Sequence, residues 1–159
     1  MTSIRKASLN DLETLADIDF QSDHPMDVQR KLTRKQMKKY LSERFKKKQE
    51  EFFIYKNKAY ITLKRDFPGY KHCEIYWLAV KKSFQRQGLG KKLVKFIEEH
   101  AKKLGFRKIC LYTGKVMKGA QIFYKKNGFK KVNEFPDHYG FNGTKKEKTA
   151  VLFCKNIRW

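Results

Sequence analysis

Two glycines at the start of a long amphipathic segment could hold an anionic group. Gly88 and Gly90 follow the nearly apolar run 73–80 and open the segment 88–104, whose apolar residues recur at helical spacing. The first backbone N–H groups of a helix have no partner within it, and that end carries a partial positive charge. Glycine lets a phosphate approach such a backbone closely. The pattern predicts a pyrophosphate site. The alternative is that the two glycines only mark an ordinary transition from loop to helix.

Residue types argue against two common phosphate-binding motifs at this position. A P-loop would need glycine in place of Gln85 and serine or threonine in place of Lys92. A dinucleotide fingerprint would need a small residue in place of Leu93. Since neither requirement is met, we expect the anion to be held by a different kind of loop.

The same segment carries a family resemblance. The run 85–90, Gln-Arg-Gln-Gly-Leu-Gly, resembles the [QR]-x-x-G-x-[GA] coenzyme A signature of the GNAT acetyltransferases, and 120–129 resembles their second hallmark, Ala-x-x-hydrophobic-Tyr-x-x-x-Gly-Phe. Nearly the whole chain fits the family layout. The resemblance implies an α/β (α+β) GNAT fold, with a central mixed twisted sheet of about six to seven strands and about four flanking helices. It also implies acetyl-CoA as the cofactor and N-acetyl transfer to a primary amine as the activity.

The resemblance further implies the cofactor contacts. In the family, the strand before the signature splays from its neighbour, and its main chain pairs with pantetheine. Met117 departs from the family pattern, which often has asparagine there, and this puts one side-chain contact in doubt. The side chains of Arg86 and Lys91 could pair with phosphate or simply be surface cations. The implied cofactor-binding set is Leu78, Ala79 and Val80 on the strand, and Gln85, Arg86, Gln87, Gly88, Leu89, Gly90 and Lys91 in the signature.

Two residues are candidates for proton transfer. About one lysine amine in a thousand is neutral at pH 7, so amine attack on a thioester benefits from a base. The resemblance assigns Tyr124 as general acid toward the coenzyme sulfur and Glu74 as general base. A carboxylate in an apolar strand should have a raised pKa, which suits a base. The alternatives are a core tyrosine at Tyr124 and a strand-end salt bridge at Glu74.

The acceptor is expected to be cationic. Acidic residues gather between 11 and 27, and in relatives this region and the loop before the last strand, here 133–148, wall the acceptor site. We therefore expect a protein N-terminus, a lysine or a polyamine, drawn toward Asp19, Asp23 or Asp27 with a contact from Tyr139. The alternative is that these carboxylates only stabilise helix N-termini or face solvent.

The net charge of +22, from 38 Lys and Arg against 16 Asp and Glu, allows other partners. Such a charge suits nucleic acid, an anionic membrane or a polyanionic small molecule, while a solvated lysine-rich surface is the plainer interpretation. The alternative function is a non-catalytic nucleic-acid-binding protein with a GNAT-like fold. No RNP-type aromatic stretch, zinc finger or recognition helix is evident, so nucleic acid is possible but not required. A monomer and a homodimer both remain open.

Location and metal content follow from composition. No apolar run is long enough to span a bilayer and the first residues lack an apolar signal core, which predicts a cytoplasmic protein without a membrane partner. Cys73, Cys110 and Cys154 are expected to be buried thiols in a reducing compartment. The four histidines are scattered singly, so no metal site is expected.

The helices and strands that must position these residues are predicted to form one domain, 1–159, and we find no repeats or interdomain linkers in the sequence. In the hairpin between the second and third strands, Asn57 is expected in a left-handed conformation. The predicted strands are 2–7, 52–55, 59–63, 73–80, 108–113, 129–132 and 149–156, and the predicted helices are 12–20, 34–45, 88–104 and 116–127.

Overall fold

The computed structural model describes residues 3–22, 32–140 and 142–157. Within them a seven-stranded sheet has the order β1-β2-β3-β4-β5-β7-β6, and its neighbours are antiparallel except for β4 and β5. The strands are β1 (Ile4–Lys6), β2 (Glu50–Tyr55), β3 (Ala59–Lys64), β4 (His72–Val80), β5 (Lys108–Gly114), β6 (Lys130–Phe135) and β7 (Ala150–Asn156). The helices are α1 (Leu12–Ser22), α3 (Arg34–Lys47), α4 (Leu89–Lys103), α5 (Lys118–Lys126) and α6 (Lys145–Lys148), with 3-10 turns η1 (Leu9–Asp11) and η2 (Lys82–Phe84). The predicted mixed sheet is confirmed.

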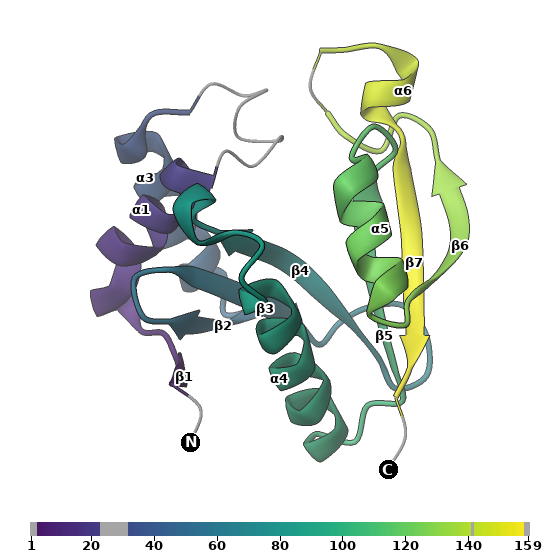
Figure 1. Ribbon diagram of the computed structural model, residues 1–159, viewed down its shortest axis with the longest axis horizontal. Coiled ribbons are helices and arrows are strands. Elements are labelled where there is room, and N and C mark those ends of the chain that lie inside the picture. The colour runs from purple at the N-terminus through teal and green to yellow at the C-terminus, as the bar shows by residue number, and fades with distance from the viewer. Residues whose placement is uncertain (1–2, 23–31, 141, 158–159) are drawn as a thin grey trace.

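Two layers of helices cover the sheet because side chains alternate along its strands. On β3, Tyr60 packs into a core with apolar residues of α1 and α3, while the next residue, Ile61, packs into a second core with residues of α4 and α5. Figure 1 shows α4 beside β3 and β4, and α5 along β5 and β7. Of the described helices, none is long and apolar enough to cross a membrane.

The sheet opens in its middle, between β4 and β5. These strands pair only from His72 to Glu74, opposite residues 108–110, and then diverge (Figure 1). On its other edge β4 has a register shift, because Thr62 lies opposite Trp77 while Leu63 lies opposite Ile75. Tyr76 is therefore the extra residue of a β-bulge, which bends a strand and increases its twist. The splay implied by the family resemblance is confirmed, and the bulge accounts for it.

Two local predictions were wrong. In the β2–β3 turn the left-handed residue is Lys56, with φ of 48°, and not Asn57. The Lys58 N–H donates to the Tyr55 carbonyl oxygen, so Lys56 is the first central residue of a two-residue turn. Cys110 and Cys154 form a disulfide, whereas Cys73 is the buried free thiol that was expected. The two bonded cysteines lie directly opposite each other on β5 and β7. Strand register across 44 residues cannot be read from the spacing of cysteines alone.

Candidate active site

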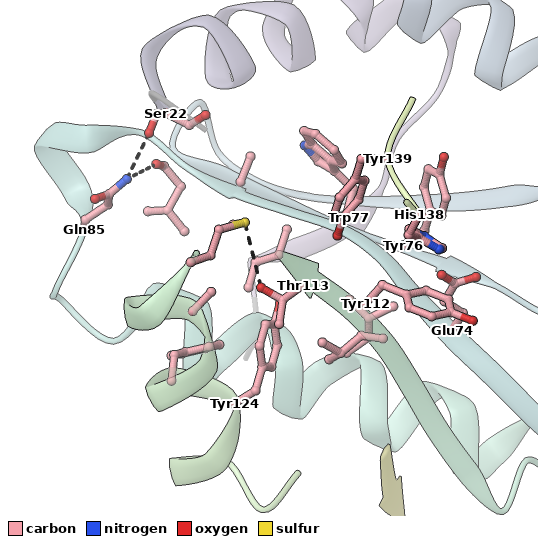
Figure 2. A pocket seen from close by; sticks show the side chains of 18 of the residues that line it. Ser22, Glu74, Tyr76, Trp77, Gln85, Tyr112, Thr113, Tyr124, His138 and Tyr139 are labelled. Carbon is pink, nitrogen blue, oxygen red and sulfur yellow. Dashed lines mark hydrogen bonds between the residues drawn. The ribbon is translucent and has the colours of Figure 1, made fainter. Parts of the chain in front are cut away.

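The opening between β4 and β5 holds a cavity of about 980 Å³ (Figure 2). Side chains from β4, β5 and α5 line it, together with the end of α1, one residue of α3 and the loop before α6. Figure 2 shows Gln85 at one end, Glu74 at the other and Tyr124 between them. The sequence-predicted residues that the cavity brings together are Glu74, Leu78, Ala79, Val80, Gln85, Tyr124 and Tyr139.

Beside the Gln85 end, α4 begins without a side-chain cap. Its N-cap is Gly88, with φ of 81°, and the first bond back to it comes from the Lys92 N–H. The N–H groups of residues 89–91 therefore have no acceptor within the helix. A Cβ placed on Gly88 would meet nothing within 4 Å in the described structure, so the space next to this backbone is open. By contrast, the N-termini of α3 and α6 each have a threonine capping box, in which the threonine side chain accepts a hydrogen bond from a backbone N–H of the first turn. The start of α4 fits a phosphate group.

The second glycine of the signature has a packing role. A Cβ on Gly90 would lie 3.1 Å from the Phe123 ring, which belongs to α5. A side chain here would push against that ring, so the absence of a Cβ allows α5 to approach the start of α4 closely. The predicted residues Arg86 and Lys91 are exposed beside this helix start, where their charges face solvent.

Gln85 braces the loop that leads to α4. Its side-chain amide donates hydrogen bonds to the Val80 carbonyl oxygen at 2.9 Å and to the Ser22 carbonyl oxygen at 3.2 Å (Figure 2). One side chain thus ties together the end of β4, the end of α1 and the loop. Gln85 lines the cavity, and its amide N–H groups donate hydrogen bonds within the protein.

The main chain of β4 offers hydrogen-bonding groups to the cavity at two of the three predicted residues. The Lys81 N–H bonds the Lys58 carbonyl oxygen, and bonded and non-bonded pairs alternate in an antiparallel ladder. This alternation turns the Ala79 main chain toward β3 and turns those of Leu78 and Val80 into the opening. The prediction of an exposed main chain is corrected for Ala79, because the strand period assigns it to the sheet.

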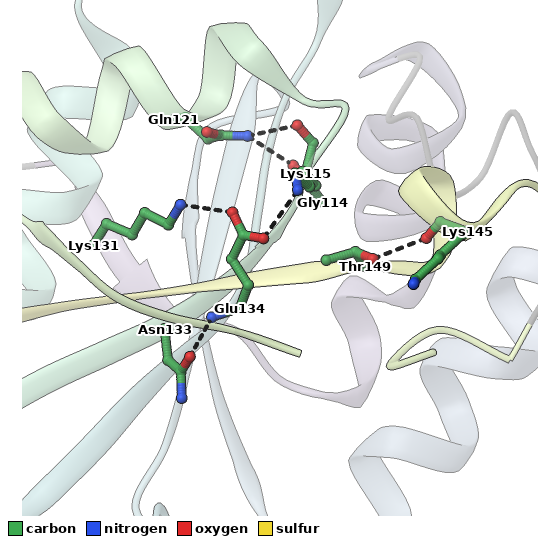
Figure 3. A network of polar contacts seen from close by, with 8 residues as sticks. All are labelled: Gly114, Lys115, Gln121, Lys131, Asn133, Glu134, Lys145 and Thr149. Carbon is green, nitrogen blue, oxygen red and sulfur yellow. Dashed lines mark hydrogen bonds and ion pairs between the residues drawn. The ribbon is translucent and has the colours of Figure 1, made fainter. Parts of the chain in front are cut away.

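Tyr124 is held against the cavity by a helix that is tied at its first turn. The Gln121 amide donates to the carbonyl oxygens of Gly114 and Lys115, at 3.1 and 2.9 Å, which anchors α5 to the end of β5 (Figure 3). Glu134 of β6 pairs with Lys115 at 3.0 Å and steadies the same turn. Burial raises the pKa of the Tyr124 phenol well above its ordinary value. The hydroxyl therefore stays protonated at physiological pH.

Glu74 is the last residue of β4 that pairs with β5. Burial raises the pKa of its carboxyl to about 7, against the opposing charge of Lys64. Among the described residues, the carboxylate makes no hydrogen bond or ion pair, so the strand-end salt bridge considered for it is absent there. A desolvated carboxyl that titrates near neutral pH can accept a proton where an ordinary surface glutamate would hold one poorly.

Asp19 does not face the cavity as predicted. Its side chain is buried, with the residue only 4% exposed, and it accepts hydrogen bonds from the Tyr60 hydroxyl at 2.7 Å and from the Trp77 indole N–H at 2.9 Å. Burial raises the pKa of its carboxyl to about 6. Asp19 thus joins α1 to the sheet, and its predicted contact with an acceptor is corrected. Asp23 and Asp27 lie outside the described residues.

The end of the cavity near Glu74 is aromatic, and most of its rings were missed from sequence. Tyr112 of β5 stacks on His138, with ring centroids 4.5 Å apart. Tyr139 was predicted to contact the acceptor. The loop that carries it is anchored because the N–H groups of His138 and Tyr139 both donate to the Lys148 carbonyl oxygen. The aromatic lining residues missed at this end are Tyr40, Tyr76, Trp77 and Tyr112. A strand bulge and a loop that folds back give no periodic sequence signal.

No cluster of three or more metal-ligating side chains occurs in the described part of the chain.

Comparison with known sequences places the chain in a family. The model of the acetyltransferase (GNAT) family matches residues 9–129. The Xenopus tropicalis protein named "Probable N-acetyltransferase 14" is 46% identical over 57 residues, which are 36% of this chain and 28% of that protein. The chain thus matches less than a third of the length of the curated relatives.

Solved structures share the fold at low sequence identity. The Desulfovibrio desulfuricans protein named "putative acetyltransferase of the GNAT family" matches with a TM-score of 0.78 and 14% identity over 98% of both chains. A chimera of spermidine N-acetyltransferase SpeG from Vibrio cholerae gives 0.77 and 14%, covering 97% of this chain and 94% of that one. PaiA N-acetyltransferase from Thermoplasma acidophilum, solved in complex with coenzyme A, gives 0.65 and 22%, covering 96% and 97%. Because the family model matches residues 9–129, which are more than half of the chain, this chain belongs to the GNAT acetyltransferase family.

Proposed function

We propose that the protein is an acetyl-CoA-dependent N-acetyltransferase that acts on a primary amine in the cytoplasm. The observation that carries the proposal is the cavity between the splayed strands, which has Glu74 at one end, Tyr124 in its middle and the uncapped start of α4 beside its other end. Membership of the GNAT family supports it, as does the coenzyme A complex of the PaiA structure.

The residues that would hold the cofactor are mainly backbone groups. The N–H groups of residues 89–91 and the open space at Gly88 suit its pyrophosphate. The main chains of Leu78 and Val80, turned into the opening, suit the amides of pantetheine, although the Val80 carbonyl already accepts from Gln85. When bound there, acetyl-CoA supplies a thioester whose carbonyl carbon is open to attack by an amine.

The side chains divide the proton transfers between them. Glu74 accepts a proton from the acceptor ammonium, directly or through water, and leaves the nitrogen lone pair free to form the new C–N bond. Tyr124, which is protonated at neutral pH, gives its proton to the sulfur as the C–S bond breaks and the sulfur takes the electron pair. The second proton that the acceptor nitrogen loses then restores the phenol. Cysteine nucleophiles have no part in this direct transfer.

The acceptor is proposed to be a cationic primary amine, such as a protein N-terminus, a lysine or a polyamine. A protonated amine is attracted to the carboxylate of Glu74 and is neutralised by it. The structural similarity to a spermidine N-acetyltransferase supports an amine of this kind.

A thiol-release assay with Tyr124→Phe tests the proposal. The wild-type protein should release free CoA from acetyl-CoA only when a primary amine is present. Loss of the Tyr124 hydroxyl should lower kcat by about 10²-fold, because the developing thiolate loses its donor. The affinity for acetyl-CoA should change less than about threefold, since the phenol does not hold the cofactor's ground state.

The matched control is Tyr70→Phe, at a tyrosine that is 73% exposed and does not line the cavity. This variant should retain the wild-type kcat. A Tyr124→Phe enzyme with unchanged kcat would remove the general-acid role, and absence of amine-dependent thiol release from the wild-type protein would remove the proposed function.

A further inference from the structure

The Glu74 end of the cavity is an aromatic compartment built around one carboxylate. Tyr112 and Tyr139 approach Glu74 from β5 and from the loop before α6, and His138 stacks on Tyr112 (Figure 2). The carboxylate of Glu74 also acts on both tyrosines electrostatically. Burial raises the pKa of both tyrosines, and the charge of Glu74 raises it further. An occupant of this compartment therefore meets aromatic rings on several sides and a single acid.

Cationic side chains are almost excluded from this lining, although the chain has 38 Lys and Arg residues. In the described structure, the one Lys or Arg side chain that lines the cavity is Lys82. It belongs to η2, which leads into the Gln85 end, away from Glu74. Burial lowers the pKa of His138, which favours the neutral ring. The described lining near Glu74 thus contains no Lys or Arg side chain.

Two further cations contact these rings from outside the lining. Lys64 lies opposite Glu74 on β3, and its ammonium sits 3.6 Å from the centre of the Tyr76 ring. The buried Arg44 guanidinium packs on Tyr40, Tyr76 and Trp77 and is paired with Glu50. Neither cation belongs to the cavity lining. Of the rings that line the cavity, those of Tyr112 and Tyr139 are the ones on which the charge of Glu74 acts.

This chemistry discriminates among amines. An apolar group attached to the amine would bury surface against the rings, which is favourable by about 25 cal/mol per Å². A carboxylate next to the amine would be desolvated without a partner, at a cost of several kcal/mol. A second ammonium on the acceptor would find no second carboxylate in the described lining.

Resting on the proposed function, we propose that the acceptor is a primary monoamine that carries an aromatic or large apolar group close to the nitrogen and no free carboxylate beside it. Free arylalkylamines share this chemistry with the N-termini of peptides that begin with an aromatic residue, where the carboxylate is replaced by an amide. In either case the acceptor ammonium gives one proton to Glu74 and loses a second as its nitrogen gains the acetyl group, and the CoA sulfur leaves and gains one proton.

Four acceptors test this inference in the thiol-release assay: phenethylamine, phenylalaninamide, free phenylalanine and spermidine. The first two should exceed free phenylalanine in kcat/KM by about 10²-fold, because only phenylalanine brings an unpaired carboxylate into the site. They should also exceed spermidine by about tenfold or more. A higher rate with phenethylamine would identify small amines as the source of the acceptor, and a higher rate with phenylalaninamide would identify peptides.

The failures are distinguishable. Phenylalanine or spermidine turned over as well as phenethylamine would overturn the inference and leave the proposed function intact. Thiol release with none of the amines in a larger panel, including lysine peptides, would remove the proposed function itself.

A ring substitution gives a second readout. Tyr112→Thr keeps a β-branched residue suited to a strand but removes the ring, so the preference for phenethylamine over ethylamine should fall about tenfold. Tyr112→Phe keeps the ring and should keep the preference, and Tyr70→Thr serves as the surface control. A preference unchanged in Tyr112→Thr would contradict the role given to this ring, because a merely structural effect would lower both rates together.

Discussion

Replacing Glu74 with glutamine should lower kcat/KM for amine acetylation by about 10²–10⁴-fold. Glutamine has nearly the same shape, but its amide cannot accept a proton from the acceptor ammonium. The carboxyl of Glu74 titrates at about 7 because it is desolvated, so wild-type kcat/KM should rise with pH through an inflection near 7 as the base is formed. The glutamine variant should lack that inflection. Steady-state kinetics between pH 6 and 9 measure both effects.

Two controls separate this loss from misfolding. Glu99→Gln removes an exposed carboxylate on α4 and should leave the kinetics within about twofold of wild type. The folded pKa of Glu74 lies above its unfolded value, so its ionisation destabilises the native state as pH rises from about 4.5 to 7. Glu74→Gln should therefore melt at a higher temperature than wild type at pH 8, with no such advantage at pH 4. A variant that keeps wild-type activity and the inflection near pH 7 would exclude Glu74 as the base.

The second large effect concerns stability. Replacing Arg44 with methionine should lower the free energy of unfolding by about 3–5 kcal/mol, because it leaves the carboxylate of Glu50 buried without its partner. The side chains of Arg44 and Glu50 are only 7% and 2% exposed, and they share two hydrogen bonds. Burial alone would lower the pKa of the guanidinium, but the hydrogen bonds to Glu50 outweigh it and keep that pKa above its ordinary value. Denaturant unfolding monitored by circular dichroism measures the loss.

The double variant Arg44→Met/Glu50→Leu is the matched control. Removing both charges replaces the ion pair with apolar volume, so most of the lost stability should return. Arg44 also packs on Tyr40, Tyr76 and Trp77. The double variant should therefore fold, but these three rings at the cavity should be less rigidly positioned. Loss of less than about 1 kcal/mol in the single variant would show that Glu50 finds another partner or takes up a proton.

Local sequence signals predicted much of the fold and the cofactor end of the site. The amphipathic helix after Gly88 was expected at 88–104 and is found as α4, Leu89–Lys103. Its glycine start is a local backbone requirement, so it can be read from residue type. The raised pKa expected for Glu74 is also found, since an acid within an apolar strand must lose solvation in any such fold.

The acceptor end depended on long-range geometry and was read less well. The bulge at Tyr76 depends on pairing with β3, and the stack of His138 on Tyr112 joins residues 26 positions apart. Asp19 seemed an exposed acid because its sequence neighbours are acidic, yet the hydroxyl of Tyr60 and the indole of Trp77 draw it into the core. Such partners lie on other elements and leave no local trace in the sequence.

Calorimetric titration of acetyl-CoA into the wild-type protein tests the central claim most directly. With the backbone N–H groups at the start of α4 open to a phosphate, the titration should show saturable heat for one molecule per chain, with Kd between about 1 μM and 1 mM. CoA should bind in the same range. A protein that unfolds cooperatively but shows no heat with either compound would contradict the assignment of this cavity as an acetyl-CoA site.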